Sequence, residues 1–414
     1  YRNVLPEKNF PMAANRATLA VLPFPNLNRD SERDYFVDGL TEDLITNLAR
    51  IPGLFVIARN SSFSYRDQPR DVRKVAEELG VRYLLEGSVR RSADKIRING
   101  QLVDGASANH IWAGKFDGVA ADIFDLQDQL TEQIVGAIEP SVRRAEIDRA
   151  RRKRPDSLDA YDLYLRALPH AHANSPTETD EALRLLHLSL QLDPNHLAAH
   201  GYAAWCHEQR YLRSGFHPED RNAALKHADI VLGINSDDPL AISIGAFIRA
   251  NLTRDYDGAI GALDRALALN ENSALALGFS ALVSAHSERH NRAVDHAQKA
   301  LRLSPLDDPL NYHPYCALAL TYLFAGQFSE AVKYSALAVQ ANPNFSVAHA
   351  YLVASQVGLG DMLAADMAAS RLLEIAPMFT VANFVQMGNF RGPLMEELAA
   401  ALRKAGLPEQ KAVE

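Results

Sequence analysis

The sequence has few cysteines and no long apolar runs. Apolar runs such as residues 54–58 are only a few residues long, whereas a membrane-spanning helix needs about 20. We therefore expect no membrane contact. The two cysteines, Cys206 and Cys316, are far apart and neither belongs to a CxxC pair, which favours buried thiols and a cytoplasmic location. The chain starts at Tyr1 rather than at a methionine, and we expect further sequence upstream.

The common catalytic motifs are also missing. The sequence contains no GxxxxGK[ST] or GxGxxG phosphate loop, no GxSxG elbow and no HExxH. Two histidine pairs, His170 with His172 and His286 with His290, lack the further ligands of a metal site. The sequence therefore predicts a chain that is not an enzyme, with no catalytic residues, no cofactor and no metal.

Acidic charge is concentrated in the second part of the chain. Residues 1–154 carry 24 Lys+Arg and 22 Asp+Glu, whereas residues 155–414 carry 19 and 29. Phosphate binding needs a basic face, so we expect no nucleic-acid binding. A run of basic residues over 143–154 is interpreted as a solvated linker helix, because acidic residues alternate with it.

A repeat begins near Leu158. Six predicted helices end on an apolar residue at spacings of 42, 35, 34, 38 and 34, and an alanine lies ten residues before each end. The ends are Leu192, Ile234, Leu269, Leu303, Ala341 and Ile375. The alanines are Ala182, Ala224, Ala259, Ala293, Ala331 and Ala365. Closing prolines follow four ends, at Pro194, Pro305, Pro343 and Pro377. Gly326 and Gly360 mark tight turns that need a positive φ.

These residues resemble the tetratricopeptide repeat family over about residues 158–384. The wide first spacing predicts a longer loop around residues 213–219, and residues 393–405 before Gly406 are expected to form a capping helix. The resemblance implies a curved superhelix that binds a protein or peptide in its concave groove. The groove should be open, or filled by a neighbouring chain or the chain's own termini; a groove packed by core side chains would contradict docking there. The expected groove residues are His207, Arg210, Tyr211, Arg249, Asn251, His286, Tyr315, Tyr322, His349 and Gln356.

The first part of the chain has the pattern of a small α/β domain. Strands are expected at residues 18–24, 54–58, 82–91, 95–103 and 110–116, and helices at 35–50, 71–79 and from 122 onward. The order β-α-β-α-β-β-β-α predicts a mixed sheet. The predicted fold class is thus a small α/β domain followed by an all-α tetratricopeptide-repeat superhelix.

Small polar residues follow the first two predicted strands. Ligands gather beyond the carboxyl ends of strands in open α/β sheets, so these residues are candidates for binding a small signal or a peptide terminus. Turn formation is the alternative explanation of the same residue types. The candidates are Asn26, Asn28, Asn60, Ser61 and Ser62.

The segments TLAVLPF, VAEELGVRYLLEGSVRR and HIWAGKFDG resemble the amino-terminal domain of the Tol-Pal translocation protein B, and SLDAYDLYLRALP resembles its junction with tetratricopeptide repeats. The resemblance implies a linker at 1–16, an α/β domain at 17–154, about six repeats at 155–392 and a cap and tail at 393–414. It implies a regulatory and protein-interaction region of a bacterial signalling protein, able to form homo-oligomers. The upstream domain would be a class III adenylate/guanylate cyclase or, alternatively, a winged-helix DNA-binding domain. An enzyme hidden in the α/β domain is the remaining alternative.

Overall fold

The computed structural model describes residues 16–27, 34–66, 71–92, 95–119, 123–154, 158–233, 236–304, 310–387 and 393–410. The chain forms two compact units, 1–161 and 162–414. Of the linker expected at residues 1–16, only residue 16 is described. Asn28, Ile234 and Pro305 also lie outside the described residues.

The first unit is built on a five-stranded mixed sheet with the order β2-β1-β3-β4-β5. Strand β1 pairs in parallel with β2 and β3, whereas β3, β4 and β5 form an antiparallel meander. The bounds are β1 Ala17–Val21, β2 Leu54–Val56, β3 Tyr83–Ser92, β4 Lys95–Asp104 and β5 His110–Val119. The alternating pattern of the last three strands thus correctly predicted strands with one face in the core.

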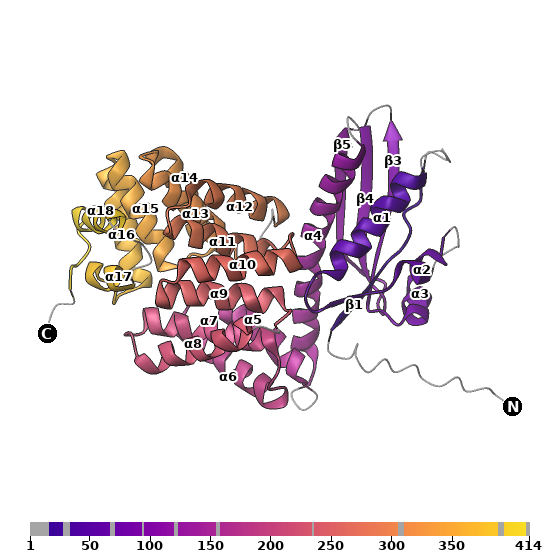
Figure 1. Ribbon diagram of the computed structural model, residues 1–414, viewed down its shortest axis with the longest axis horizontal. Helices are drawn as coiled ribbons and strands as arrows, with labels where there is room; N and C mark the ends of the chain where they lie inside the picture. Colours follow the sequence, from indigo (N-terminus) through magenta and orange to yellow (C-terminus); the bar gives the residue numbers. More distant parts are fainter. Residues whose placement is uncertain are drawn as a thin grey trace. The chain divides into compact units, whose positions relative to one another are not determined.

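Helices cover both faces of this sheet (Figure 1). The bounds are α1 Asp34–Ala49, α2 Arg59–Phe63, α3 Val72–Leu79 and α4 Ile123–Arg152. The main core lies between one face and helices α1 and α4, and a smaller core packs α3 on the other face. Asp71 caps α3, and Gly80 ends it with a φ of 65°, so this helix lies within the expected range 71–79. The short helix α2 was not predicted; its sequence RNSSF was assigned to a loop.

The second unit consists of paired helices in sequence order (Figure 1). Turns of two to four residues join the members of each pair. The pairs are α5 Ala160–His172 with α6 Pro176–Leu192, α7 Leu197–Arg213 with α8 Pro218–Leu232, α9 Pro239–Thr253 with α10 Tyr256–Leu269, α11 Ala274–His286 with α12 His290–Leu303, α13 Tyr312–Phe324 with α14 Phe328–Ala341, and α15 Ser346–Leu359 with α16 Met362–Ile375. Helix α17 Val381–Met387 and the expected cap, α18 Pro393–Lys404, follow. The fold class is therefore a small α/β unit followed by an all-α array of helix pairs.

The alanines that recur in the sequence are the contact points of the array. All six have an exposed fraction of 0%. A side chain of this size lets neighbouring helices approach closely, because a larger one would meet the facing backbone. Gly326 and Gly360 adopt φ values of 68° and 85° at the turns, as predicted.

Helix α8 ends at Leu232, and its expected last residue, Ile234, lies outside the described residues. One local prediction about the array needs correction. The wide first spacing does not come mainly from a longer loop, because the turn between α7 and α8 has only four residues. It comes more from helix α7, which has 17 residues where α11 and α13 have 13.

Candidate functional site

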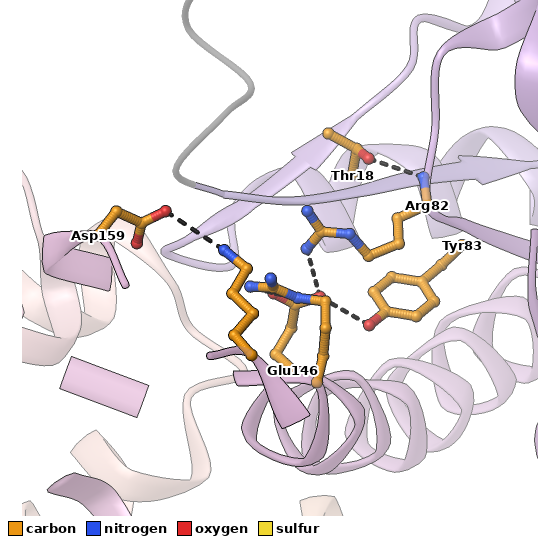
Figure 2. Close-up of polar contacts among 7 residues, drawn as sticks. Thr18, Arg82, Tyr83, Glu146 and Asp159 are labelled. Carbon is orange, nitrogen blue, oxygen red and sulfur yellow. Dashed lines mark hydrogen bonds and ion pairs between the residues drawn. The ribbon is translucent and has the colours of Figure 1, made fainter. Parts of the chain in front are cut away.

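A buried carboxylate joins helix α4 to the sheet of the first unit. The carboxylate of Glu146 accepts hydrogen bonds from the Tyr83 hydroxyl at 2.6 Å and from Arg82 Nη1 at 2.5 Å (Figure 2). Arg149, one turn further along α4, lies 3.0 Å from the other carboxylate oxygen. The Arg82 amide also binds the Thr18 hydroxyl at 2.8 Å, which ties this end of β3 to β1. Burial and the negative charge of Glu146 raise the pKa of Tyr83, so its phenol stays protonated.

The sequence contains a signal for the burial of Glu146. The buried stripe of α4 runs through every fourth residue, from Leu130 through Ile134, Ile138 and Val142. Glu146 is the next member of the stripe and is only 1% exposed. A carboxylate in an apolar stripe is stable only when charged partners surround it, so its position alone predicted a buried ion pair.

A cleft of about 530 Å³ lies beside this cluster, between α4 and the strands. Tyr83 borders it, and its charged lining comprises three arginines and two aspartates: Arg144, Arg149, Arg152, Asp104 and Asp148. The basic run at the end of α4 is otherwise paired, with contacts such as Arg151 to Asp148 at 3.9 Å and Lys153 to Asp159 at 3.6 Å. These contacts support the interpretation of the run as a balanced linker helix.

The small polar residues expected to line a ligand pocket lie in three settings. Asn26 is half-buried and forms a bridge to Val89 of β3. Asn60 and Ser61 are exposed on α2, whereas Ser62 is fully buried. For these residues, ligand binding stays a prediction.

Aromatic side chains of the first helices of the pairs fill the inner face of the array. The Phe247 and Phe279 rings stack at 4.3 Å, and the edge of His313 meets Phe279 at 4.8 Å. Trp205 lies 5.6 Å from Phe279, and all four side chains are at most 5% exposed. The chain's own core therefore occupies the space in which the sequence predicted a peptide groove.

Contacts between distant turns close the same face. Asn342 Nδ2 donates to the carbonyl of His172 at 3.2 Å, although the two are 170 residues apart. Asn344 Nδ2 donates to the carbonyl of Ala173 at 3.0 Å, and Asn174 donates to the Tyr312 hydroxyl at 3.4 Å. The turn after α5 thus lies against the turn after α14. The chain's own side chains and turns therefore occupy the inner face between these repeats, which argues against an open groove there.

The expected groove residues are accordingly dispersed. His286, His349 and Asn251 are buried at 2%, 2% and 7% exposure, so these side chains present almost no surface to a partner here, and their role in docking stays a prediction. Arg249 is exposed but pairs with Asp229 at 3.7 Å. The remaining ones, His207, Arg210, Tyr211, Tyr315, Tyr322 and Gln356, are half-buried.

An apolar surface remains on the last helix pair. Leu363 and Met367, four residues apart on one face of α16, are 74% and 67% exposed. Met362 at the start of the same helix is 38% exposed, and we call the exposed side chains of Met362, Leu363 and Met367 the α16 face. The sequence gives no separate signal for this surface, because the same helix also carries the buried alanine of its repeat, Ala365.

The structure also brings together histidines that were not singled out as a set. His187, His207 and His227 come from three consecutive helices, and ligand-capable atoms of all three lie within 4.8 Å of one another. Two successive intervals of 20 residues were the only sequence signal. Both cysteines are free and buried, and burial raises the pKa of each thiol, as expected for structural residues.

A family model and a relative each match part of the chain. Residues 15–133 match the family described as "HilA/YgeH-like transcriptional regulator, second domain". A Rhizobium meliloti (strain 1021) protein named "Putative adenylate cyclase 3" is 46% identical over 190 residues, which are 46% of this chain and 32% of that protein. The chain therefore matches only about a third of this relative.

Solved structures are similar only at a distance. TolB from Acinetobacter baumannii aligns with 31% of this chain and 28% of its own, at 18% identity and a TM-score of 0.23. A tetratricopeptide repeat protein from Parabacteroides merdae aligns with 60% and 92%, at 13% identity and a TM-score of 0.34. Within the described ranges, no helix is long and apolar enough to cross a membrane.

Proposed function

We propose that this chain is the regulatory and protein-interaction region of a longer bacterial signalling protein that also carries a class III adenylate/guanylate cyclase domain. The cyclase-named relative, 46% identical over nearly half of this chain, supports the assignment. The α/β unit would sense or transmit a signal, and the array would dock a protein. The buried, unpaired cysteines fit a cytoplasmic setting.

The effector-sensing half of a winged-helix transcriptional regulator is the second candidate. The match of residues 15–133 to a domain of such regulators favours it. The sequence encoded upstream of Tyr1 separates the two. A domain with paired metal-binding aspartates supports the cyclase, and a winged helix with a basic recognition helix supports the regulator. Finding neither contradicts both.

The α16 face is the observation that carries the interaction function. Methionine and leucine side chains at i and i+4 present an adaptable apolar strip, which is the surface that an amphipathic helix recognises. Asp361 and Asp366 are exposed beside the strip. We therefore propose a partner helix with an apolar stripe flanked by Lys or Arg.

A labelled amphipathic peptide with a leucine stripe and lysine flanks tests this surface in the full chain by fluorescence anisotropy. Burial of each large apolar side chain contributes about 1.5–3 kcal/mol, so Leu363→Glu with Met367→Glu should weaken binding by more than about tenfold. Leu192→Glu is the control, because Leu192 is 60% exposed on α6, outside the α16 face. Equal binding by both variants, or no binding by the unmodified chain, contradicts this assignment.

A further inference from the structure

Three imidazoles converge at the junction of helices α6, α7 and α8. His187, His207 and His227 each come from one of these helices. The His207 ring lies 5.9 Å from that of His187 and 6.0 Å from that of His227, centroid to centroid. Their candidate ligand atoms lie within 4.8 Å of one another. Each side chain is held by a different helix, so the packing of the array sets their spacing.

Hydrogen bonds fix which nitrogen of His207 is free. Its Nδ1 lies 2.8 Å from Oδ1 of Asp220, whose side chain is only 5% exposed. A carboxylate only accepts, so Nδ1 carries the proton and donates it. The lone pair is left on Nε2. A carboxylate that orients a histidine in this way is the usual outer contact of a metal-binding imidazole.

A second chain of hydrogen bonds orients His227. Nε2 of His200 lies 2.9 Å from the carbonyl oxygen of Pro194, so this nitrogen donates. In neutral His200, Nδ1 is then an acceptor, and it lies 2.7 Å from Nδ1 of His227. His227 therefore donates through Nδ1 and keeps its lone pair on Nε2. His207 and His227 thus each keep a lone pair on Nε2, because their Nδ1 groups donate hydrogen bonds to Asp220 and to His200.

The charges around the cluster do not oppose a cation. Arg210 and Lys226 are basic groups near the cluster. Arg210 lies 3.3 Å from Asp220 and 3.5 Å from Asp180, so two carboxylates balance its charge.

We propose that His187, His207 and His227 bind one divalent transition-metal ion, with Asp220 and His200 orienting two of the ligands. Three imidazoles suit Zn²⁺, which binds histidine nitrogen at about 2.0–2.1 Å. Tetrahedral binding brings the nitrogens to about 3.4 Å from one another, so the cluster must contract. His187 is the exposed member and can move without disturbing the core. Three protein ligands leave a fourth position for water or for a donor of a partner.

Zinc titration of the full chain tests the site. The chain, freed of any purification tag and stripped with a chelator, should bind one Zn²⁺ in calorimetry and gain thermal stability on binding. His187→Gln and the double variant His207→Gln with His227→Gln should each weaken this binding by about 100-fold or more, since a ligand contributes at least as much as the 10- to 100-fold typical of an orienting residue. His290→Gln, an exposed histidine of α12, should bind as the unmodified chain does.

A second variant separates ligation from folding. Asp220→Asn keeps the shape of the side chain, and it should lower zinc affinity about 10- to 100-fold while Zn²⁺ is still bound at one per chain. His187→Gln alters only an exposed side chain, so its metal-free melting temperature should not change. Absence of saturable binding, or binding that survives in His187→Gln and in the double variant, overturns the proposal.

Discussion

The hydroxyl of Tyr83 lies 2.6 Å from Oε1 of Glu146 and donates a hydrogen bond to it. Glu146→Gln keeps the size of the side chain but leaves Arg82 and Arg149 without their carboxylate. Breaking a buried ion pair lowers the free energy of unfolding by about 3–5 kcal/mol. Because both arginines are partly exposed, we expect this variant to lower it by about 2 kcal/mol. Hydrogen exchange should accelerate in the last turns of α4, as measured by mass spectrometry.

The matched control for this variant is Glu139→Gln on the same helix. Glu139 lies 3.9 Å from Arg143 and its side chain is 29% exposed. Ion pairs of this kind contribute about 0–1 kcal/mol, so exchange in α4 should barely change. Equal effects of the two substitutions would contradict a specific role for the Glu146 cluster.

The recurrent alanines should tolerate no larger side chain. Ala259→Leu inserts a branched side chain at a position of α10 that is fully buried, and overpacking should lower the free energy of unfolding by about 1–3 kcal/mol. Ala268→Leu on the exposed side of the same helix should change it by less than about 0.5 kcal/mol. Urea denaturation followed by circular dichroism measures both. A neutral Ala259→Leu would refute close packing at this position.

The aromatic filling of the inner face should be central to stability. Phe279 contacts Phe247, Trp205 and His313 and is fully buried. Phe279→Ala should therefore cost about 3–5 kcal/mol in urea unfolding. Leu363→Ala, which shortens an exposed side chain, should cost little. If the alanine at position 279 were harmless, the inner face would not be a packed core.

His286 should make the stability of the array depend on pH. Burial lowers its pKa to about 3, whereas an unfolded histidine titrates near 6.5. The unfolded chain then takes up the proton first. Stability should be constant with respect to this group above about pH 6.5, and should fall by up to about 1.4 kcal/mol per pH unit between 6.5 and 3.

Urea midpoints between pH 7 and pH 4.5 measure this dependence. The free energy of unfolding should depend less steeply on pH in His286→Gln than in the unmodified chain, by the contribution of about one proton. His110→Gln, an exposed histidine of β5, should leave the slope as it is. An unchanged slope in His286→Gln would show that another group carries the acid sensitivity.

Periodicity predicted most of the fold. Alternation in β4 and the stripe of α4 follow directly from burial on one face, and the alanine period follows from helix-to-helix contact. Helix α2 was not predicted, because its sequence RNSSF has no apolar periodicity and consists mostly of residue types that are common in turns. The greater length of α7 was not predicted either. The spacing between the helix ends of successive repeats is the same whether the added residues form a helical turn or a loop.

The sites were harder to predict, since they depend on contacts between distant residues. The period placed His286 and His349 on the first helices of their pairs but could not show that the inner face is filled. That filling arises from rings such as Phe247 and Phe279, which come from different repeats. The histidine cluster likewise requires three helices to be packed in register.

The hydrogen bonds from Asn342 and Asn344 to the turn after α5 have a consequence for cooperativity. An open array unfolds repeat by repeat, because each repeat contacts only its neighbours. Here the first helix pair, α5 with α6, also contacts the fifth, α13 with α14. Unfolding of either pair therefore removes contacts that the other pair makes. Residues 162–345 should therefore unfold as a single unit, while the segment from α16 to α18 remains free to fray independently.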